Sequence, residues 1–206
     1  KNLKPLGKCA SLQILECKKL ELESLEGIAG LVNLIELDCS ENLLIDIEPL
    51  KNMNLLEKLN ISLNQDIESI EPLRNKPNLT ELRMRKMKVK NISAISTCVN
   101  MTILDFFSNE IGSLSALKSL KKIAYLDCGF AKIPSLAPLA GHRNLVYFYC
   151  GGNAITDISV VKNFYALKHL KIGRTSVESL DPIMKHQYLQ RIDIFETKIS
   201  VGEKDR

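Results

Sequence analysis

The sequence predicts an α/β solenoid, a curved array in which short parallel strands form one face and short helical turns form the other. Two observations support this fold class. A leucine-centred pattern returns at a fixed interval along the whole chain, and each copy alternates apolar and polar residues with the period of a strand. A single copy is too short to bury its own apolar side, so the core must form between neighbouring copies.

The repeat has an interval of 22 residues, except for one interval of 23 between Leu56 and Leu79. We place the extra residue near Gln65 and Asp66, in a loop. In each unit the opening apolar residue is followed by apolar residues three and five positions later. We expect one domain over residues 1–206, with a half unit at 1–11 and units that start at residues 12, 34, 56, 79, 101, 123, 145, 167 and 189. Because the chain begins with Lys1 and a half unit, we expect it to be a piece of a longer protein.

Two further slots carry structural information. The strand segment is closed by Asn in four units, and an Asn amide can donate and accept hydrogen bonds to its own and the adjacent turn. Proline recurs in the second half of the unit, where its fixed φ suits the start of a helical turn. We therefore expect single 3-10 or α turns on the convex side, and about nine strands that span roughly 40 Å on the concave side. The residues in these slots are Asn42, Asn64, Asn109 and Asn153, and Pro49, Pro72, Pro138 and Pro182.

This pattern resembles the leucine-rich repeats, specifically the 22-residue class of the phosphatase-one regulatory repeat protein and the bacterial internalins. The resemblance covers residues from Leu3 to Ile199. It implies a right-handed, horseshoe-like solenoid and a non-catalytic module that binds a protein partner through its concave face. The internalins imply an alternative, a bacterial surface domain that recognises a host or matrix ligand. A third interpretation is a structural or sensor arm of a larger signalling protein.

The six cysteines do not predict a disulfide framework. Cys9 and Cys98 fill the last apolar slot of their units, and the other four occupy the same inward strand slot: Cys17, Cys39, Cys128 and Cys150. Parallel strands point neighbouring Cβ atoms the same way, so we expect free, buried thiols. The sequence has no C-x-x-C, which argues against zinc. Reduced cysteines favour a cytoplasmic location, with the bacterial surface or secretion as the alternative.

The remaining polar residues favour no enzyme and no cofactor. His142 and His186 share a slot with apolar residues and are expected to be partly buried, and no nucleophile has a plausible base and orienting group. The basic run from Arg83 to Lys90 is divided by the register, so we interpret it as a solvated face and expect no nucleic-acid partner. No segment is apolar enough to cross a membrane, and we expect a monomer.

The outward strand positions change character at the fifth unit. The first four units carry scattered charges, whereas the next units carry aromatic residues, with Ile103 beside them. Gly129, Gly151 and Gly173 remove side chains from one edge of this patch, which predicts a shallow trough beside an aromatic ridge. Grouped exposed aromatics are typical of binding hot spots. Our candidate partner-binding residues are Asp105, Phe107, Tyr125, Asp127, Phe130, Tyr147, Tyr149, His169 and Lys171.

Two points about this patch stay open at the level of sequence. The aromatics could serve only to pack across strands, and the glycines only to permit the turn that leaves each strand. Asp105 and Asp127 are like charges on adjacent strands. We expect Arg83 to pair with Asp105, while Asp127 awaits a basic group from a partner.

Overall fold

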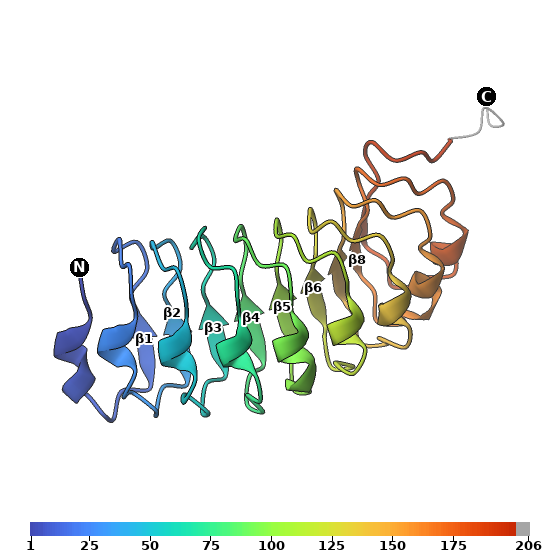
Figure 1. Ribbon diagram of the computed structural model, residues 1–206. Helices are drawn as coiled ribbons and strands as arrows, with labels where there is room; N and C mark the ends of the chain where they lie inside the picture. The colour runs from blue at the N-terminus through green and yellow to red at the C-terminus, as the bar shows by residue number, and fades with distance from the viewer. Residues whose placement is uncertain (201–206) are drawn as a thin grey trace.

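A computed structural model describes residues 1–200 and shows a solenoid with a single parallel sheet (Figure 1). Within those residues, nine three-residue strands lie in chain order, each paired with the next. They are β1 (Ile14–Glu16), β2 (Glu36–Asp38), β3 (Lys58–Asn60), β4 (Glu81–Arg83), β5 (Ile103–Asp105), β6 (Tyr125–Asp127), β7 (Tyr147–Tyr149), β8 (His169–Lys171) and β9 (Arg191–Asp193).

Each strand is preceded, on the other side of the array, by a short 3-10 turn. Across residues 1–200 all helical segments are of the 3-10 type, so the alternative of α turns is not realised. They are η1 (Lys4–Lys8), η2 (Glu26–Ile28), η3 (Glu48–Leu50), η4 (Glu71–Leu73), η5 (Ser93–Thr97), η6 (Ser115–Leu117), η7 (Ala137–Leu139), η8 (Ser159–Asn163) and η9 (Asp181–Ile183). As predicted, prolines occupy the first positions of η3, η4, η7 and η9. No described helix is long and apolar enough to span a membrane.

Strand register follows the repeat without offset. Leu104 aligns with Leu82 on one side and Leu126 on the other, and all three side chains are buried. The extra residue falls in a loop as predicted, because Asn64 and the next buried residue, Ile67, are one residue further apart than Asn42 and Leu44. The apolar slots therefore form continuous columns through the array, and these columns are the core.

The closing asparagines join each unit to the one before it. Asn109 Nδ2 donates to Met84 O of the preceding unit at 2.7 Å and to Phe106 O of its own unit at 3.0 Å. Its Oδ1 accepts from the backbone N–H of Val89 at 3.2 Å. Asn42, Asn64 and Asn153 make the same contacts. Thr175, in the equivalent slot, reaches only Ile172 O in its own unit.

A second slot on the convex side also holds polar groups. Nε2 of buried His142 lies 3.0 Å from Leu117 O, and Nε2 of half-buried His186 lies 2.9 Å from Val161 O. Lys76 fills the same slot, where its Nζ donates to Lys51 O at 3.0 Å. His186 thus packs partly buried as predicted, whereas His142 is fully buried, and each of the three side chains hydrogen-bonds a carbonyl of the preceding unit. Burial lowers the pKa of both His142 and Lys76.

The cysteines are free throughout the part of the chain that the structure describes. Five are buried, and burial raises the pKa of the Cys39 and Cys128 thiols well above the usual range, so they act as small apolar groups. The prediction was wrong for Cys9, which is exposed. It follows η1, which buries no residue, because the half unit at residues 1–11 has a neighbour on one side only.

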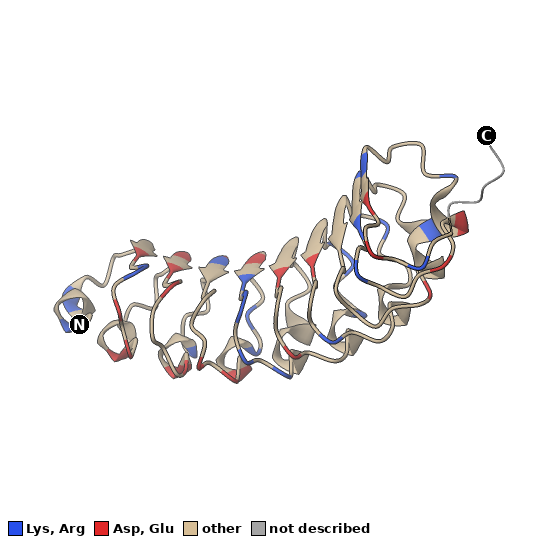
Figure 2. Ribbon diagram, turned by 90° about the horizontal axis from the view of Figure 1, so that it is seen from above, with Lys and Arg blue, Asp and Glu red and all other residues tan. Residues whose placement is uncertain are grey.

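The array is curved. In the view from above, the strands lie along the inner side of the bend and the 3-10 turns along the outer side (Figure 2). The side chains that point outward from the strands therefore line the concave face, where the candidate site lies.

Candidate functional site

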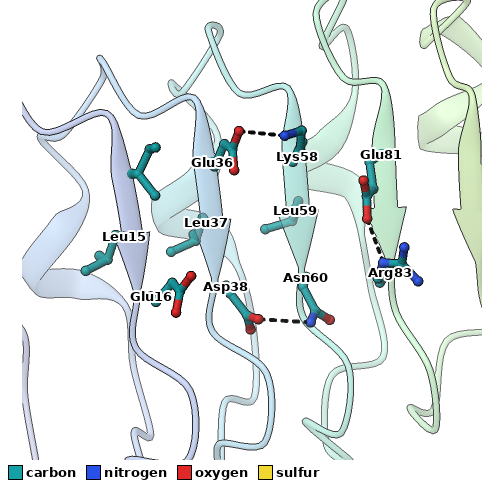
Figure 3. A pocket seen from close by; sticks show the side chains of 11 residues that line it. Leu15, Glu16, Glu36, Leu37, Asp38, Lys58, Leu59, Asn60, Glu81 and Arg83 are labelled. Atoms are coloured by element: carbon teal, nitrogen blue, oxygen red, sulfur yellow. Dashed lines mark hydrogen bonds and ion pairs between the residues drawn. The ribbon is translucent and has the colours of Figure 1, made fainter.

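The concave face of the first four units is a shallow hollow in which the polar side chains other than Glu16 pair with one another (Figure 3). Lys58 Nζ lies 2.7 Å from Glu36 Oε1, and Arg83 Nε lies 2.6 Å from Glu81 Oε1. Asn60 also donates to Asp38, at 3.2 Å. Exposed pairs of this kind contribute little stability, and they leave few unpaired groups for a ligand.

From β5 onward the face is aromatic, but the rings form two groups instead of one ridge. The first group contains tyrosines on adjacent strands. Tyr125 lies 5.9 Å from Tyr147 and 5.7 Å from Tyr149 between ring centroids. The His169 ring extends this group, 4.8 Å from Tyr147. Tyr147 remains 37% exposed.

The second group contains Phe107 and Phe130, whose centroids are 5.5 Å apart in an edge-on arrangement. The Arg85 guanidinium lies 4.8 Å above the Phe107 ring. Phe130 has a φ of 52°, in the left-handed region, and is 42% exposed. Among the described residues, no ring contact joins this group to the tyrosines.

Between and beside these rings lies the predicted trough, with glycines along its floor. The turn explanation for Gly129, Gly151 and Gly173 was wrong, because the left-handed position of the turn belongs to the following residue, such as Phe130 or Gly152. These glycines are required by close approach instead. A Cβ at Gly129 would lie 3.1 Å from the Phe107 ring, and one at Gly151 would lie 2.7 Å from Gly173 O.

Four residues that the sequence reasoning left out of the site also line the trough: Arg85, Arg174, Asp193 and Phe195. Phe195 covers Gly173, since a Cβ there would meet the phenyl ring at 2.6 Å. Arg85 and Phe195 occupy the same outward slot as Phe107, so the repeat itself held the signal that could have found them.

The two acidic residues share Arg85, and the predicted pair of Arg83 with Asp105 is present as a longer contact. Arg85 Nη1 lies 2.8 Å from Asp105 Oδ2 and 3.6 Å from Asp127 Oδ2. Arg83 Nη1 approaches Asp105 only to 4.0 Å, because its guanidinium pairs with Glu81 on the same strand. Arg85 follows the end of β4, where the chain leaves the sheet, and its guanidinium lies against Phe107 and both carboxylates.

Burial dominates the electrostatics of this network. It raises the pKa of Asp127 to about 6, with a further contribution from the negative charge of Asp105. Burial also raises the pKa of Asp105, although Arg85 opposes the change. The pKa of Tyr125 rises to about 12, through burial first and then the two carboxylates. Tyr125 therefore stays a neutral hydrogen-bonding phenol throughout the physiological range.

The structure divides the predicted site residues by accessibility. Asp105 is fully buried and Asp127 nearly so, which means that Asp105 can act on a partner only through Arg85. The others are at least partly exposed: Phe107, Tyr125, Phe130, Tyr147, Tyr149, His169 and Lys171. Residues 1–200 contain no His, Cys, Asp and Glu cluster arranged to hold a metal ion.

No protein-family model and no curated protein sequence matches this chain. Solved structures do match. An internalin, InlF from Listeria monocytogenes, is 26% identical with a TM-score of 0.93, covering 97% of this chain and 59% of its own. Internalin C2 from the same organism is 22% identical with a TM-score of 0.88, over 91% of this chain and 83% of its own. The plant peptide hormone receptor RGFR1 in complex with RGF2 is 20% identical with a TM-score of 0.77, over 94% of this chain and 37% of its own.

These likenesses, together with the nine-stranded sheet of the described residues, identify the fold. The chain is a leucine-rich-repeat protein that resembles bacterial internalins, and it spans 59% of the length of InlF. Two of these structures are internalins, and the third is a peptide hormone receptor in complex with RGF2.

Proposed function

We propose that this chain is a non-catalytic module that binds a protein partner through the concave face of units five to eight. The proposal rests on the difference between the first four units and units five to eight of that face. Polar side chains in the first four units pair with one another, whereas units five to eight present partly exposed rings such as Tyr147 and Phe130.

Those rings have the properties of a binding surface. Aromatic side chains bury a large area with few rotatable bonds, so they lose little entropy on binding. The contacts of Tyr147 with Tyr125 and His169 hold the ring in place before any partner arrives. Packing across strands and binding are therefore compatible roles for the same residues.

A double substitution tests the proposal. Tyr147→Ala with Tyr149→Ala should abolish capture of the native partner in a quantitative pull-down from the source cells, since it removes the two rings that project from β7. The far-ultraviolet circular dichroism and the melting temperature should stay close to those of the parent, because neither ring belongs to the buried core.

Two exposed tyrosines away from the strands provide the matched control. Tyr165→Ala with Tyr188→Ala removes the same chemical groups at positions that are 57% and 65% exposed. This control should retain capture. Capture that survives in the β7 variant, or is lost equally in both variants, would show that the concave tyrosines are not the site.

A second candidate function is supported by the likeness to two Listeria internalins. In this version the chain is a surface domain of a bacterium, and the concave face recognises a host or matrix ligand. The two versions differ in where the partner is found. Adhesion of chain-coated beads to intact animal cells, lost in the β7 double variant, would favour the surface domain over a scaffold inside the cell.

A further inference from the structure

The backbone N–H of the residue two positions after each strand shows a regular pattern. In most units it is satisfied by a side-chain oxygen at the last strand residue. Ser40 N donates to Asp38 Oδ1 at 3.0 Å, and Gly129 N donates to Asp127 Oδ1 at 3.1 Å. Ser62, Phe107 and Phe195 repeat the arrangement through Asn60, Asp105 and Asp193, and Arg85 N donates to Ser62 Oγ.

Units seven and eight break the pattern. Their last strand residues are Tyr149 and Lys171, and neither carries an oxygen that can fold back onto its own turn. Consequently the N–H groups of Gly151 and Gly173 donate no hydrogen bond to any residue in the range 1–200. The backbone N–H of Lys18 in the first unit also donates no hydrogen bond to a described residue, but Lys18 does not line the trough. Unsatisfied backbone donors are rare away from water, and of this pair on adjacent units Gly173 is buried, so the two N–H groups are candidates for an acceptor from a ligand.

A third donor lies beside the pair. Lys171 lines the same trough, with its Nζ 4.4 Å from the Tyr149 ring centroid. Among the described residues it has no carboxylate within ion-pair distance. The nearby acids already have partners, because Asp127 accepts from Gly129 N and forms an ion pair with Arg85 at 3.6 Å, and Asp193 accepts from Phe195 N.

The glycines of the trough are covered differently. The rings of Phe107 and Phe195 lie against Gly129 and Gly173, whereas the group next to Gly151, on the side where a Cβ would lie, is the backbone of Gly173. Gly173 is buried beneath Phe195, and Gly151 is half-buried and reachable from the concave face. Of the three donors, the Gly151 N–H and the Lys171 ammonium belong to partly exposed residues, and the Gly173 N–H belongs to a buried one.

We infer that this place binds a carboxylate side chain, Asp or Glu, of the protein partner. Strands of adjacent units are about 4.8 Å apart, so the two oxygens of one planar carboxylate suit two N–H donors at that spacing, and Lys171 neutralises the charge. The inference rests on the proposed function for the nature of the partner. It specifies that the partner places an acidic side chain against units seven and eight.

The backbone amide signals of this chain in NMR spectra give a direct test that needs no partner. The probe is N-acetylglutamic acid amide with a free side-chain carboxylate, and the control is N-acetylglutamine amide, at constant ionic strength. The carboxylate should move the amide proton signals of Gly151 and Gly173 downfield in a saturable manner. The uncharged control should leave both in place, and Lys171→Met should weaken the response several-fold.

Two substitutions at one position separate the backbone donors from the tyrosine ring. Tyr149→Asn supplies the oxygen that Asn60 offers to Ser62, so Gly151 should gain an internal acceptor and lose its response to the probe. Tyr149→Leu removes the ring without supplying an acceptor, and the response should persist. Both variants disturb the Lys171 contact with Tyr149 equally, which makes them a matched pair.

Three results would overturn the inference: equal shifts with both probes, an undiminished Gly151 response in Tyr149→Asn, or a response to inorganic phosphate but not to the carboxylate. The last would assign the site to a phosphorylated group. The proposed function can fail separately, because loss of capture in the Tyr147 and Tyr149 double variant does not depend on the glycine amide signals.

Discussion

At the scale of single residues, the main electrostatic feature of the concave face is one arginine between two acids. Arg85 pairs at 2.8 Å with Asp105 and at 3.6 Å with Asp127. Removing two carboxylates from water is costly, and one guanidinium compensates one of them better than the other. Asp127 is the less compensated of the two, which agrees with its raised pKa.

Asp127→Asn should therefore stabilise the protein at neutral pH. The pKa of Asp127 is about 6 in the folded protein and about 3.9 unfolded, so the folded state holds its proton more tightly. Stability linked to this group is present below about pH 4 and is lost as the pH rises through about 6. The variant should gain about 1 to 3 kcal/mol of unfolding free energy at pH 7.5, and almost nothing at about pH 4.

Urea denaturation at the two pH values measures this difference. The substitution preserves the local backbone bond, because Asn60 occupies the same slot in unit three and accepts from Ser62 N at 3.2 Å. A variant less stable than the parent at neutral pH would contradict the prediction. It would mean that attraction to Arg85 outweighs the burial of the charge.

The same network shows where sequence reasoning stops at this scale. Register correctly predicted which side chains face the groove, and that two acids there needed a cation. It selected Arg83, which is directly across from Asp105 and pairs with it at 4.0 Å, whereas Arg85 makes the closer contact at 2.8 Å. Arg85 is in the next outward slot of the repeat, so the pattern places it on the same face. The pattern does not show which of several long side chains within reach of a carboxylate lies closest to it.

At the scale of the repeating element, the buried asparagines determine how firmly a unit is held to its predecessor. Asn109→Ala should lower the free energy of unfolding by about 2 to 4 kcal/mol, since it leaves Met84 O, Phe106 O and Val89 N without their partner in a buried place. Asn144→Ala is the matched control. Its Nδ2 also donates to the preceding unit, at Lys121 O, but from an exposed position, so the loss should stay below about 1 kcal/mol.

Chemical denaturation of both variants tests the difference. Equal losses would show that the buried ladder contributes no more than an exposed hydrogen bond. The closing slot of unit eight holds Thr175, which makes no side-chain bond to unit seven within the described residues.

Prediction from sequence was most complete at this scale, because strand, turn and loop positions all follow from one period. The prolines and the extra residue at Gln65 and Asp66 fell where the period required. The unpaired N–H groups of Gly151 and Gly173 were not foreseen. They arise because Tyr149 and Lys171 stand where five other units carry Asp or Asn, and the apolar pattern that defines the repeat does not include this slot.

At the scale of the whole molecule, the curved array has no centre that every part touches. Each strand pairs only with its immediate neighbours, so each inward side chain is covered by the units on its two sides (Figure 1). Leu104 and Leu15 occupy the same strand slot. Leu104, between β4 and β6, is fully buried, whereas Leu15 on β1 is only partly covered.

The same Leu→Ala substitution at these two positions should therefore differ in the stability that is lost and in the number of units that are affected. Leu104→Ala leaves a cavity between two neighbours and should reduce stability by about 2 to 5 kcal/mol, while Leu15→Ala should lose roughly half of that or less. Hydrogen exchange measures how many units are affected. Leu104→Ala should lower amide protection in units four, five and six together, and Leu15→Ala only in the first two units. If Leu15→Ala reduced protection evenly along the whole chain, the units would form a single cooperative block. The effect of a substitution on the concave face could then not be assigned to the unit that contains it.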